Sequence, residues 1–260
     1  MTETVSVVLR AAEPGVLPPP SPSRVEEVEL PLGALVNAHH DYGDDPAAPK
    51  VRAWISAAPI DDPTQLWWSL AAAFEHTGLW PLVVTTLSDE QTPGRPWRTG
   101  ELGDPREPAR DAEEFFSDVD SHRYPDGFPG LAEAQRPEGD TVELPRIGLP
   151  VGQLMLVATT RPADVLGRLG WLGAVNHHEA GDLTVVLRSW EDRFGTVPVL
   201  VGFDTLGTLS AAVPKEGDDL RRLVAEHYAF CPDNVDQGTD DLDAYAASVS
   251  GSPTWTFWWD

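Results

Sequence analysis

The feature that most constrains the fold is a helix that ends at a glycine and runs directly into an apolar strand. Residues 61–78, DDPTQLWWSLAAAFEHTG, open with two aspartates and a proline, which favour the first turn of a helix. Apolar residues then recur at helical spacing, and Gly78 is a typical helix stop. The run WPLVVTTL (80–87) is typical of a buried strand. Because VRAWISAAP (51–59) also predicts a strand, we expect a βαβ unit with a right-handed crossover.

The second half of the chain repeats this order with different spacings. EAGDLTVVLRSWEDRFG (179–195) predicts an amphipathic helix that ends at Gly195, and TVPVLVGFD (196–204) predicts the strand after it. This repeated order of elements is compatible with a duplication of one half of the chain and does not establish one. Further predicted elements are strands at 153–160, 207–214 and in the terminal TWTFWWD, and helices at 161–171, 216–230 and 240–250.

Two segments break this regular pattern. Residues 11–24 are rich in proline and predict an extended arm or linker. Residues 88–150 are dense in proline, glycine and charge, so we expect a long excursion with a short helix at 112–119. The predicted fold class is α/β, a mixed sheet flanked by helices and built from two βα(α)β-like halves. The expected organisation is an N-terminal strand and arm (1–30), an N-terminal α/β half (31–150) and a C-terminal α/β region (151–260), the last two forming one compact domain.

Composition restricts the class of protein. The 260 residues are 41% hydrophobic and include ten tryptophans, which suffices for a core, and no apolar run reaches the ~20 residues of a membrane helix. The N-terminus lacks the features of a signal peptide, and the single cysteine, Cys231, allows no intrachain disulfide. We therefore expect a cytoplasmic protein. The net charge of −24 disfavours nucleic acid and anionic membranes and favours a basic protein partner, although solubility alone also explains such a charge.

Histidines and carboxylates gather in two places, NAHHDYGDD (37–45) and VNHHEAGDL (175–183). These side chains are ligands for zinc and similar ions, but neighbouring residues rarely bind one ion together. The alternative is a polar turn before a helix, with an acidic residue at the helix N-terminus. The candidate metal ligands are His39, His40, Asp41, Asp44 and Asp45 in the first stretch, and His177, His178, Glu179 and Asp182 in the second.

Two further stretches carry candidate chemistry. Cys231 follows the predicted helix that contains His227, so a catalytic Cys–His pair is one interpretation, and a small buried cysteine that closes the helix is the other. In the tail, Trp255, Phe257 and Trp259 alternate onto one face of a strand. They can stack on a sugar or a base, or they belong to a strand buried on both sides.

The C-terminal part, from about residue 150, carries a set of motif residues: Trp190, Phe194, Gly195, Asp204, Thr205, Glu226, Tyr228, Cys231, Pro232, Asp233, Gln237, Gly238, Trp258, Trp259 and Asp260. In these residues it resembles the bacterial domain-of-unknown-function family 4253. The family tends to carry a Trp-Asn followed by a pair such as Cys-Pro, where this chain has Val175-Asn176-His177-His178. The resemblance implies a fold and no activity. Its motif carboxylates and the nearby cation form a candidate polar pocket or structural network: Arg193, Asp204, Glu226, Asp233 and Asp260.

We therefore expect a non-enzymatic binding module without a cofactor, one that interacts with a basic protein as an immunity protein does with a cationic toxin. The first alternative is a metal-assisted hydrolase that uses His177, His178, Asp182 and either Asp204 or Asp233. The second is a thiol enzyme at Cys231. The sequence leaves the oligomeric state open.

Overall fold

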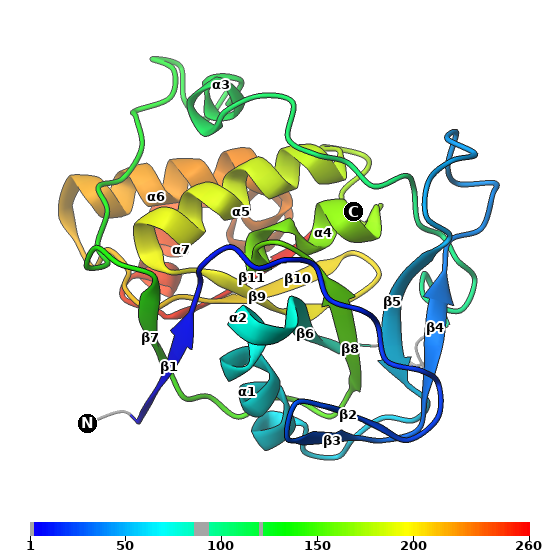
Figure 1. The fold of residues 1–260 in the computed structure, drawn as a ribbon. Coiled ribbons are helices and arrows are strands. Elements are labelled where there is room, and N and C mark those ends of the chain that lie inside the picture. Colours follow the sequence, from blue (N-terminus) through cyan, green and yellow to red (C-terminus); the bar gives the residue numbers. More distant parts are fainter. Residues whose placement is uncertain (1–2, 86–93, 120–121) are drawn as a thin grey trace.

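A seven-stranded mixed sheet forms the centre of the computed structural model, which describes residues 3–85, 94–119 and 122–260 (Figure 1). Of the described strands in this sheet, β6 and β9 run parallel, and every other neighbouring pair is antiparallel. The predicted fold class is therefore confirmed. In sheet order the strands are β11 (Thr254–Trp258), β10 (Thr205–Leu209), β9 (Val197–Val201), β6 (Leu79–Val84), β8 (Gln153–Ala158), β5 (Val51–Ser56) and β4 (Gly33–Asn37).

The sheet combines strands from both halves of the chain. β5 and β6, which flank the first predicted helix, run in the same direction, but β8 lies between them and is antiparallel to both. The expected βαβ unit is thus split by a strand that comes about seventy residues later in the chain. The two strands that follow a glycine stop, β6 and β9, lie side by side and form the parallel pair.

Helices lie on both sides of the sheet (Figure 1). The first predicted helix is two consecutive helices, and both Gly78 and Gly195 adopt the left-handed conformation that ends a helix. No described helix is long and apolar enough to cross a membrane. The helices are α1 (Thr64–Ala72), α2 (Phe74–Thr77), α3 (Ala112–Ser117), α4 (Val165–Leu169) after a 3-10 turn at Pro162–Asp164, α5 (Ala180–Phe194), α6 (Gly217–Phe230), a π-helical turn at Asn234–Thr239, and α7 (Leu242–Val249).

Buried tryptophans join the layers. Trp67 on α1 donates its indole N–H to the carbonyl of Pro81, and Trp80 on β6 donates to the carbonyl of Pro198 on β9, at 2.9 and 2.8 Å. Both indoles are fully buried and pack edge to face, 5.8 Å between centroids. A buried indole needs an acceptor for its N–H, and the carbonyls of the strand prolines supply it here.

The segment predicted as an excursion crosses the layer of α5 and α6 and then adds a strand (Figure 1). Its short helix, α3, is confirmed and is capped by Asp111, whose side chain accepts from the amide of Glu114 at 2.9 Å. Further on, β7 (Thr141–Pro145) pairs antiparallel with β1 (Thr4–Val8). The sequence pattern did not predict a strand at β7. A second small hairpin joins β2 (Ser23–Val25) and β3 (Val28–Leu30). Residues 86–87 of the predicted strand lie outside the described residues.

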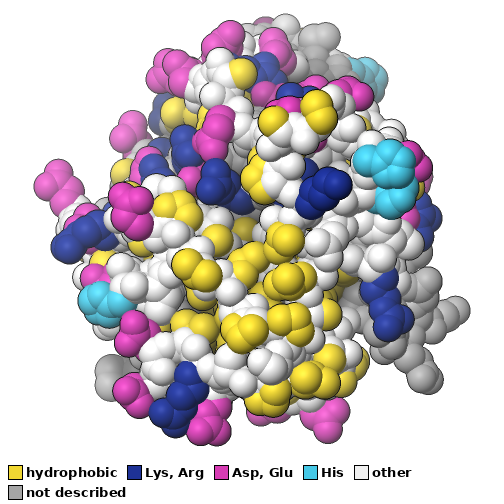
Figure 2. Space-filling view, turned by 45° about the vertical axis from the view of Figure 1, so that its right-hand side comes forward, with side chains coloured by type: hydrophobic (Ala, Val, Ile, Leu, Met, Phe, Trp, Pro, Cys, Tyr) yellow, Lys and Arg dark blue, Asp and Glu magenta, His cyan; other side chains and the backbone are white. Residues whose placement is uncertain are grey.

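The predicted proline-rich arm runs without regular structure between β1 and β2 and is tied to the core by Ala12 and Gly15, whose amides donate to the carbonyls of Thr160 and Gly78. Figure 2 shows hydrophobic side chains gathered in the middle of one face, with charged side chains mainly around them.

The tail corrects one expectation. In β11 the side chains of Trp255 and Phe257 are buried, as is Trp259 after it, whereas Thr256 is exposed and Trp258 is 36% exposed. The tail is therefore buried on one face and not on both, because β11 is an edge strand whose outer face meets solvent. The aromatic side chains on its inner face pack against α5 and α6, with Trp190 and Phe257 stacked at 5.5 Å, and are not a stacking platform for a ligand.

Candidate functional site

Arg193 and Glu226, two of the predicted polar residues, form a buried ion pair. Their closest N–O distance is 2.6 Å, and the Glu226 side chain has no exposed surface. The carboxylate also accepts the Trp190 indole N–H at 2.7 Å and the Ala132 amide at 2.8 Å. Each carboxylate oxygen thus accepts two hydrogen bonds. A carboxylate whose acceptors are filled by its own protein is a structural group, and this one fixes the excursion to α5 and α6.

Asp233 holds the tail to the loop that precedes α5. One oxygen accepts the Asp260 amide at 3.0 Å and lies 3.1 Å from His177 Nε2, and the other accepts from Gln237 at 3.0 Å. The amide side chain of Asn176 donates to the backbone carbonyl of Asp260, also at 3.0 Å. These bonds join three segments that are distant in sequence, so this second cluster closes the fold at the end of the chain.

Asp204 takes a smaller part in fixing the tail. Its backbone carbonyl accepts the amide of Trp259 at 3.0 Å, and its carboxylate accepts the hydroxyl of Thr205 at 2.9 Å. The five predicted polar residues are therefore distributed among separate contacts. Each contact joins groups of the protein itself, as expected for a structural network and not for a single polar pocket.

The candidate thiol is deeply buried. Cys231 is 0% exposed, its Sγ lies 2.9 Å from the Trp258 carbonyl, and burial raises the pKa of the thiol to about 12. The imidazole of His227 contacts the Tyr245 hydroxyl at 3.1 Å instead of the sulfur. Burial, with a smaller effect of the Arg193 charge, lowers the pKa of His227 to about 3. A protonated thiol and a neutral imidazole with different partners do not make a nucleophile and base.

The four metal candidates of the second stretch do not converge. Glu179 is exposed and lies 3.9 Å from Arg106, and the other three contact three different partners. His177 faces Asp233, the Nε2 of His178 contacts the Ala229 carbonyl at 3.0 Å, and Asp182 forms a 2.9 Å ion pair with Arg110. Burial lowers the pKa of His178, so its ring is neutral and Nε2 carries the proton that it donates. Arg110 and both histidines line a cavity of about 250 Å³ beside α3.

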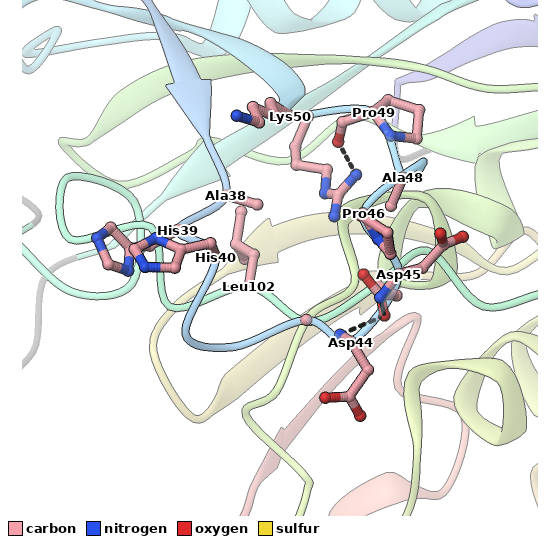
Figure 3. Close-up of a pocket in the computed structure, with 13 residues that line it drawn as sticks. Ala38, His39, His40, Asp44, Asp45, Pro46, Ala48, Pro49, Lys50 and Leu102 are labelled. Atoms are coloured by element: carbon pink, nitrogen blue, oxygen red, sulfur yellow. Dashed lines mark hydrogen bonds between the residues drawn. The ribbon is translucent and has the colours of Figure 1, made fainter.

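The first histidine stretch borders a cavity of about 520 Å³ (Figure 3). The loop 38–50, which joins β4 to β5, forms most of its wall, and Asp104 closes one side. The Asp104 carboxylate accepts the amides of Asp44 and Asp45 at 2.8 and 2.9 Å, and these bonds lead the effects that lower its pKa. The lining residues are Ala38, His39, His40, Gly43, Asp44, Asp45, Pro46, Ala48, Pro49, Lys50, Arg52, Leu102 and Asp104.

Arg52 is a site residue that the sequence analysis missed. It is 6% exposed and donates to the carbonyls of Pro49 and Gly103, but its Nε is buried with no hydrogen-bond partner in the described residues. Burial lowers the pKa of its guanidinium, against the opposing effect of Asp104. The sequence feature that could have indicated Arg52 is its position as the one charged residue in the otherwise apolar run 51–59.

The side chains of His39, His40 and Asp41 converge, whereas those of His177, His178 and Asp182 point to separate partners. His39 Nδ1 lies 3.4 Å from one Asp41 oxygen and His40 Nε2 lies 3.1 Å from the other. The imidazole rings are 4.3 Å apart and lie next to each other at the edge of the cavity in Figure 3. Among the described residues, this is the group of three whose ligand atoms all lie within 4.8 Å of one another.

A third cavity, a groove of about 390 Å³, lies between α6, α7 and the segment 122–130. Its lining is largely apolar and includes charged side chains of both signs. The lining residues are Tyr124, Pro129, Asp218, Arg221, Arg222, Val224, Leu242, Asp243 and Ala246. No local pattern in the sequence marks this groove, because its two walls come from segments about one hundred residues apart.

Comparisons with known proteins bear on the C-terminal region alone. No curated protein matches the chain, and no solved structure matches it. The buried ion pair, the tail contacts, the thiol and the second histidine stretch all lie within one matched segment. Residues 153–260 match the family described as Domain of unknown function (DUF4253), which confirms the resemblance that the sequence motifs indicated for this region.

Proposed function

We propose that this chain is a non-enzymatic binding protein for a basic protein partner, and that the groove between α6, α7 and segment 122–130 is the contact surface. The observation that carries the proposal is a groove whose lining is largely apolar and also contains Asp243, an acidic side chain without an ion-pair partner among the described residues. Val224, Leu242 and Ala246 supply apolar surface, and Asp243 supplies negative charge, whereas the charge of Asp218 is balanced by Arg221. An amphipathic segment with lysines or arginines beside its apolar face fits both.

The cations near the groove are already paired with carboxylates of this chain. Arg221 and Arg222 pair with Asp218 and Asp219 on the same helix, and Arg123 contacts Asp236 at 2.8 Å. These arginines therefore do little to repel a basic partner.

The local charge is also acidic. Residues 215–243 contain nine Asp or Glu and three Lys or Arg. Glu226 and Asp233 are buried, and four others pair with arginines, which leaves Glu216, Asp241 and Asp243 without an ion pair among the described residues. The net charge of the chain has the same sign, at −24. A concentrated negative surface accelerates association with a basic partner and selects against acidic ones. An immunity protein that neutralises a cationic toxin would use this kind of surface.

The test uses a fluorescent amphipathic peptide with lysines on its polar face and a matched peptide in which glutamates replace the lysines. Fluorescence anisotropy should detect binding of the basic peptide alone. Raising the ionic strength from about 0.01 M to about 0.15 M shortens the Debye length from about 30 Å to about 8 Å and should weaken the binding.

A pair of charge reversals locates the binding surface. Asp243→Lys removes a rim charge and should weaken the basic peptide about three- to tenfold, an effect of a rim charge on association. Glu27→Lys makes the same change of net charge in the β2–β3 turn, where the side chain is 97% exposed, and should change the affinity less than twofold. Equal effects of the two variants, or equal binding of both peptides, would show that the groove is not the contact surface.

The metal-assisted hydrolase at His177, His178 and Asp182 is not proposed, because each of these side chains already contacts a different protein group.

A further inference from the structure

We propose that His39, His40 and Asp41 form a binding site for one divalent transition-metal ion of the zinc class. Two imidazoles and one carboxylate are the donor set that such ions prefer, whereas Mg²⁺ and Ca²⁺ prefer oxygen ligands. The site lies in the loop 38–50, outside the segment that matches the family and far in sequence from the groove proposed above, so it stands independently of that proposal.

The spacing of the donor atoms fits a metal ion. Zinc lies about 2.0–2.2 Å from nitrogen and oxygen ligands, so two ligands of one ion are about 2.9 Å apart at a right angle and about 3.4 Å apart at a tetrahedral angle. The two nitrogen-to-carboxylate distances here, 3.4 Å from His39 and 3.1 Å from His40, lie in that interval. The carboxylate of Asp41 thus stands between the two imidazoles, with one oxygen facing each.

A turn explains how adjacent residues can share one ion. The His39 carbonyl accepts the Tyr42 amide at 3.2 Å, so the chain reverses over residues 39–42. Side chains of neighbouring residues point to opposite faces of a strand, but a reversal brings them together. The Asp41 amide also approaches His39 Nδ1 at 3.4 Å, a long contact that a metal ion can replace at small cost.

The loop is held in place on both sides of the turn. The amide of His39 donates to Gly100 and the amide of Ala38 donates to Lys50, both at 2.8 Å. After the turn, the Asp104 carboxylate binds the amides of Asp44 and Asp45. A backbone fixed in this way reduces the entropy that metal binding would otherwise cost.

The surroundings favour a bound cation with free coordination positions. The three side chains remain 48%, 80% and 67% exposed in the order His39, His40 and Asp41, so water can complete the shell. The lining of the adjoining cavity carries three carboxylates, Asp44, Asp45 and Asp104, against two cations, Lys50 and Arg52, so the excess charge beside the site is negative and attracts a cation.

The test is a titration of the purified, tag-free, metal-free chain with Co²⁺, whose visible absorption reports coordination, followed by displacement with Zn²⁺. We expect saturation at one ion per chain, loss of the signal when Zn²⁺ is added, and no competition from excess Mg²⁺. His39→Ala/His40→Ala and Asp41→Asn should each weaken binding at least tenfold. All three side chains are exposed, so the variants should fold, which circular dichroism will verify.

The matched control is His177→Ala/His178→Ala, which removes the other adjacent histidine pair of the chain. It should bind Co²⁺ with the affinity of the wild type. The proposal fails if the wild-type chain binds less than one ion, if the His39/His40 variant binds as tightly as the wild type, or if the His177/His178 variant loses the ion instead.

Discussion

The two adjacent histidine pairs have the same dipeptide and nearly the same neighbours, but they lie in opposite environments. His177 and His178 follow an asparagine, precede an acidic residue, and each contacts a different part of the fold, Asp233 for one and the Ala229 carbonyl for the other. His39 and His40 also precede an acidic residue, but their rings contact each other and Asp41 and remain exposed. The difference lies in what packs against each pair and not in the motif.

The regions that contain the two histidine pairs differ in the same way, in the partners of their polar groups. The C-terminal region places its motif carboxylates in bonds that join distant segments, such as the one from Glu226 to residue 132, ninety-four positions away. The loop 38–50 bonds mainly to its own hairpin and to residues 100–104. Polar groups in the first region stabilise the fold, and those in the second remain accessible to a ligand. The following experiments test this contrast, from the largest expected effect to the smallest.

Glu226→Ala should cause the largest loss of stability, about 3–5 kcal/mol, because it leaves Arg193 buried without its partner. Asp41→Ala, the removal of an exposed carboxylate in the loop, should change the unfolding free energy by less than about 0.5 kcal/mol. Urea unfolding in metal-free buffer measures both. Similar losses in the two variants would remove the contrast between the regions.

Acid should weaken the C-terminal region through His227. The pKa of its imidazole is lowered to about 3 by burial, below an unfolded value of about 6.5. Above pH 6.5 the His227 imidazole is neutral in both the folded and the unfolded state, so its burial causes no pH-dependent loss of stability there. As the pH falls from about 6.5 toward 3, the unfolded state takes up the proton first, and stability falls by up to about 1.4 kcal/mol per pH unit.

His227→Phe isolates this effect, because phenylalanine can occupy the aromatic surroundings of Trp190 and Trp255 without a titratable group. Between pH 6.5 and pH 5 the wild type should lose about 1.6 kcal/mol more unfolding free energy than the variant. Parallel pH profiles of the two proteins would mean that His227 accepts a proton in the folded state as readily as in the unfolded state.

The two histidine pairs should differ in their direct effect on stability. His177→Ala removes one partner of Asp233, which keeps its bonds to Gln237 and Asp260, so we expect a loss of about 1 kcal/mol. His40→Ala should stay within about 0.5 kcal/mol of the wild type. Thermal and urea unfolding without metal compare the two, and a larger loss in His40→Ala would reverse the assignment of structural and accessible pairs.

Cys231 should show no reaction at all with a small alkylating reagent in the folded protein. Its thiol is fully buried and its raised pKa keeps it protonated. His40→Cys places a second thiol in the exposed loop and should react rapidly, which controls for the reagent. Rapid modification of Cys231 in the native wild type, located by mass spectrometry, would revive the thiol-enzyme hypothesis.

Much of the local structure was predictable because its signals are local. Gly78 and Gly195 end their helices in the left-handed conformation, with φ of 59° and 63°, and the strand after each begins within two residues. The alternation in the tail placed Trp255 and Phe257 on one face, but whether the other face is covered depends on the position of β11 at the sheet edge. β7 escaped prediction because five alternating residues inside a proline-rich segment become a strand only by pairing with β1.

The sequence by itself determined the type of most helices and strands, the places where they end, the acidic charge and the short set of polar residues that could carry chemistry. Only the tertiary structure decided the insertion of β8 between β5 and β6, the partners of Glu226 and Asp233, and which histidine pair converges. The physical reason is range. Capping, periodicity and charge act over a few residues or sum over the chain, whereas the availability of a buried polar group depends on which distant donors and acceptors the fold brings within about 3 Å of it.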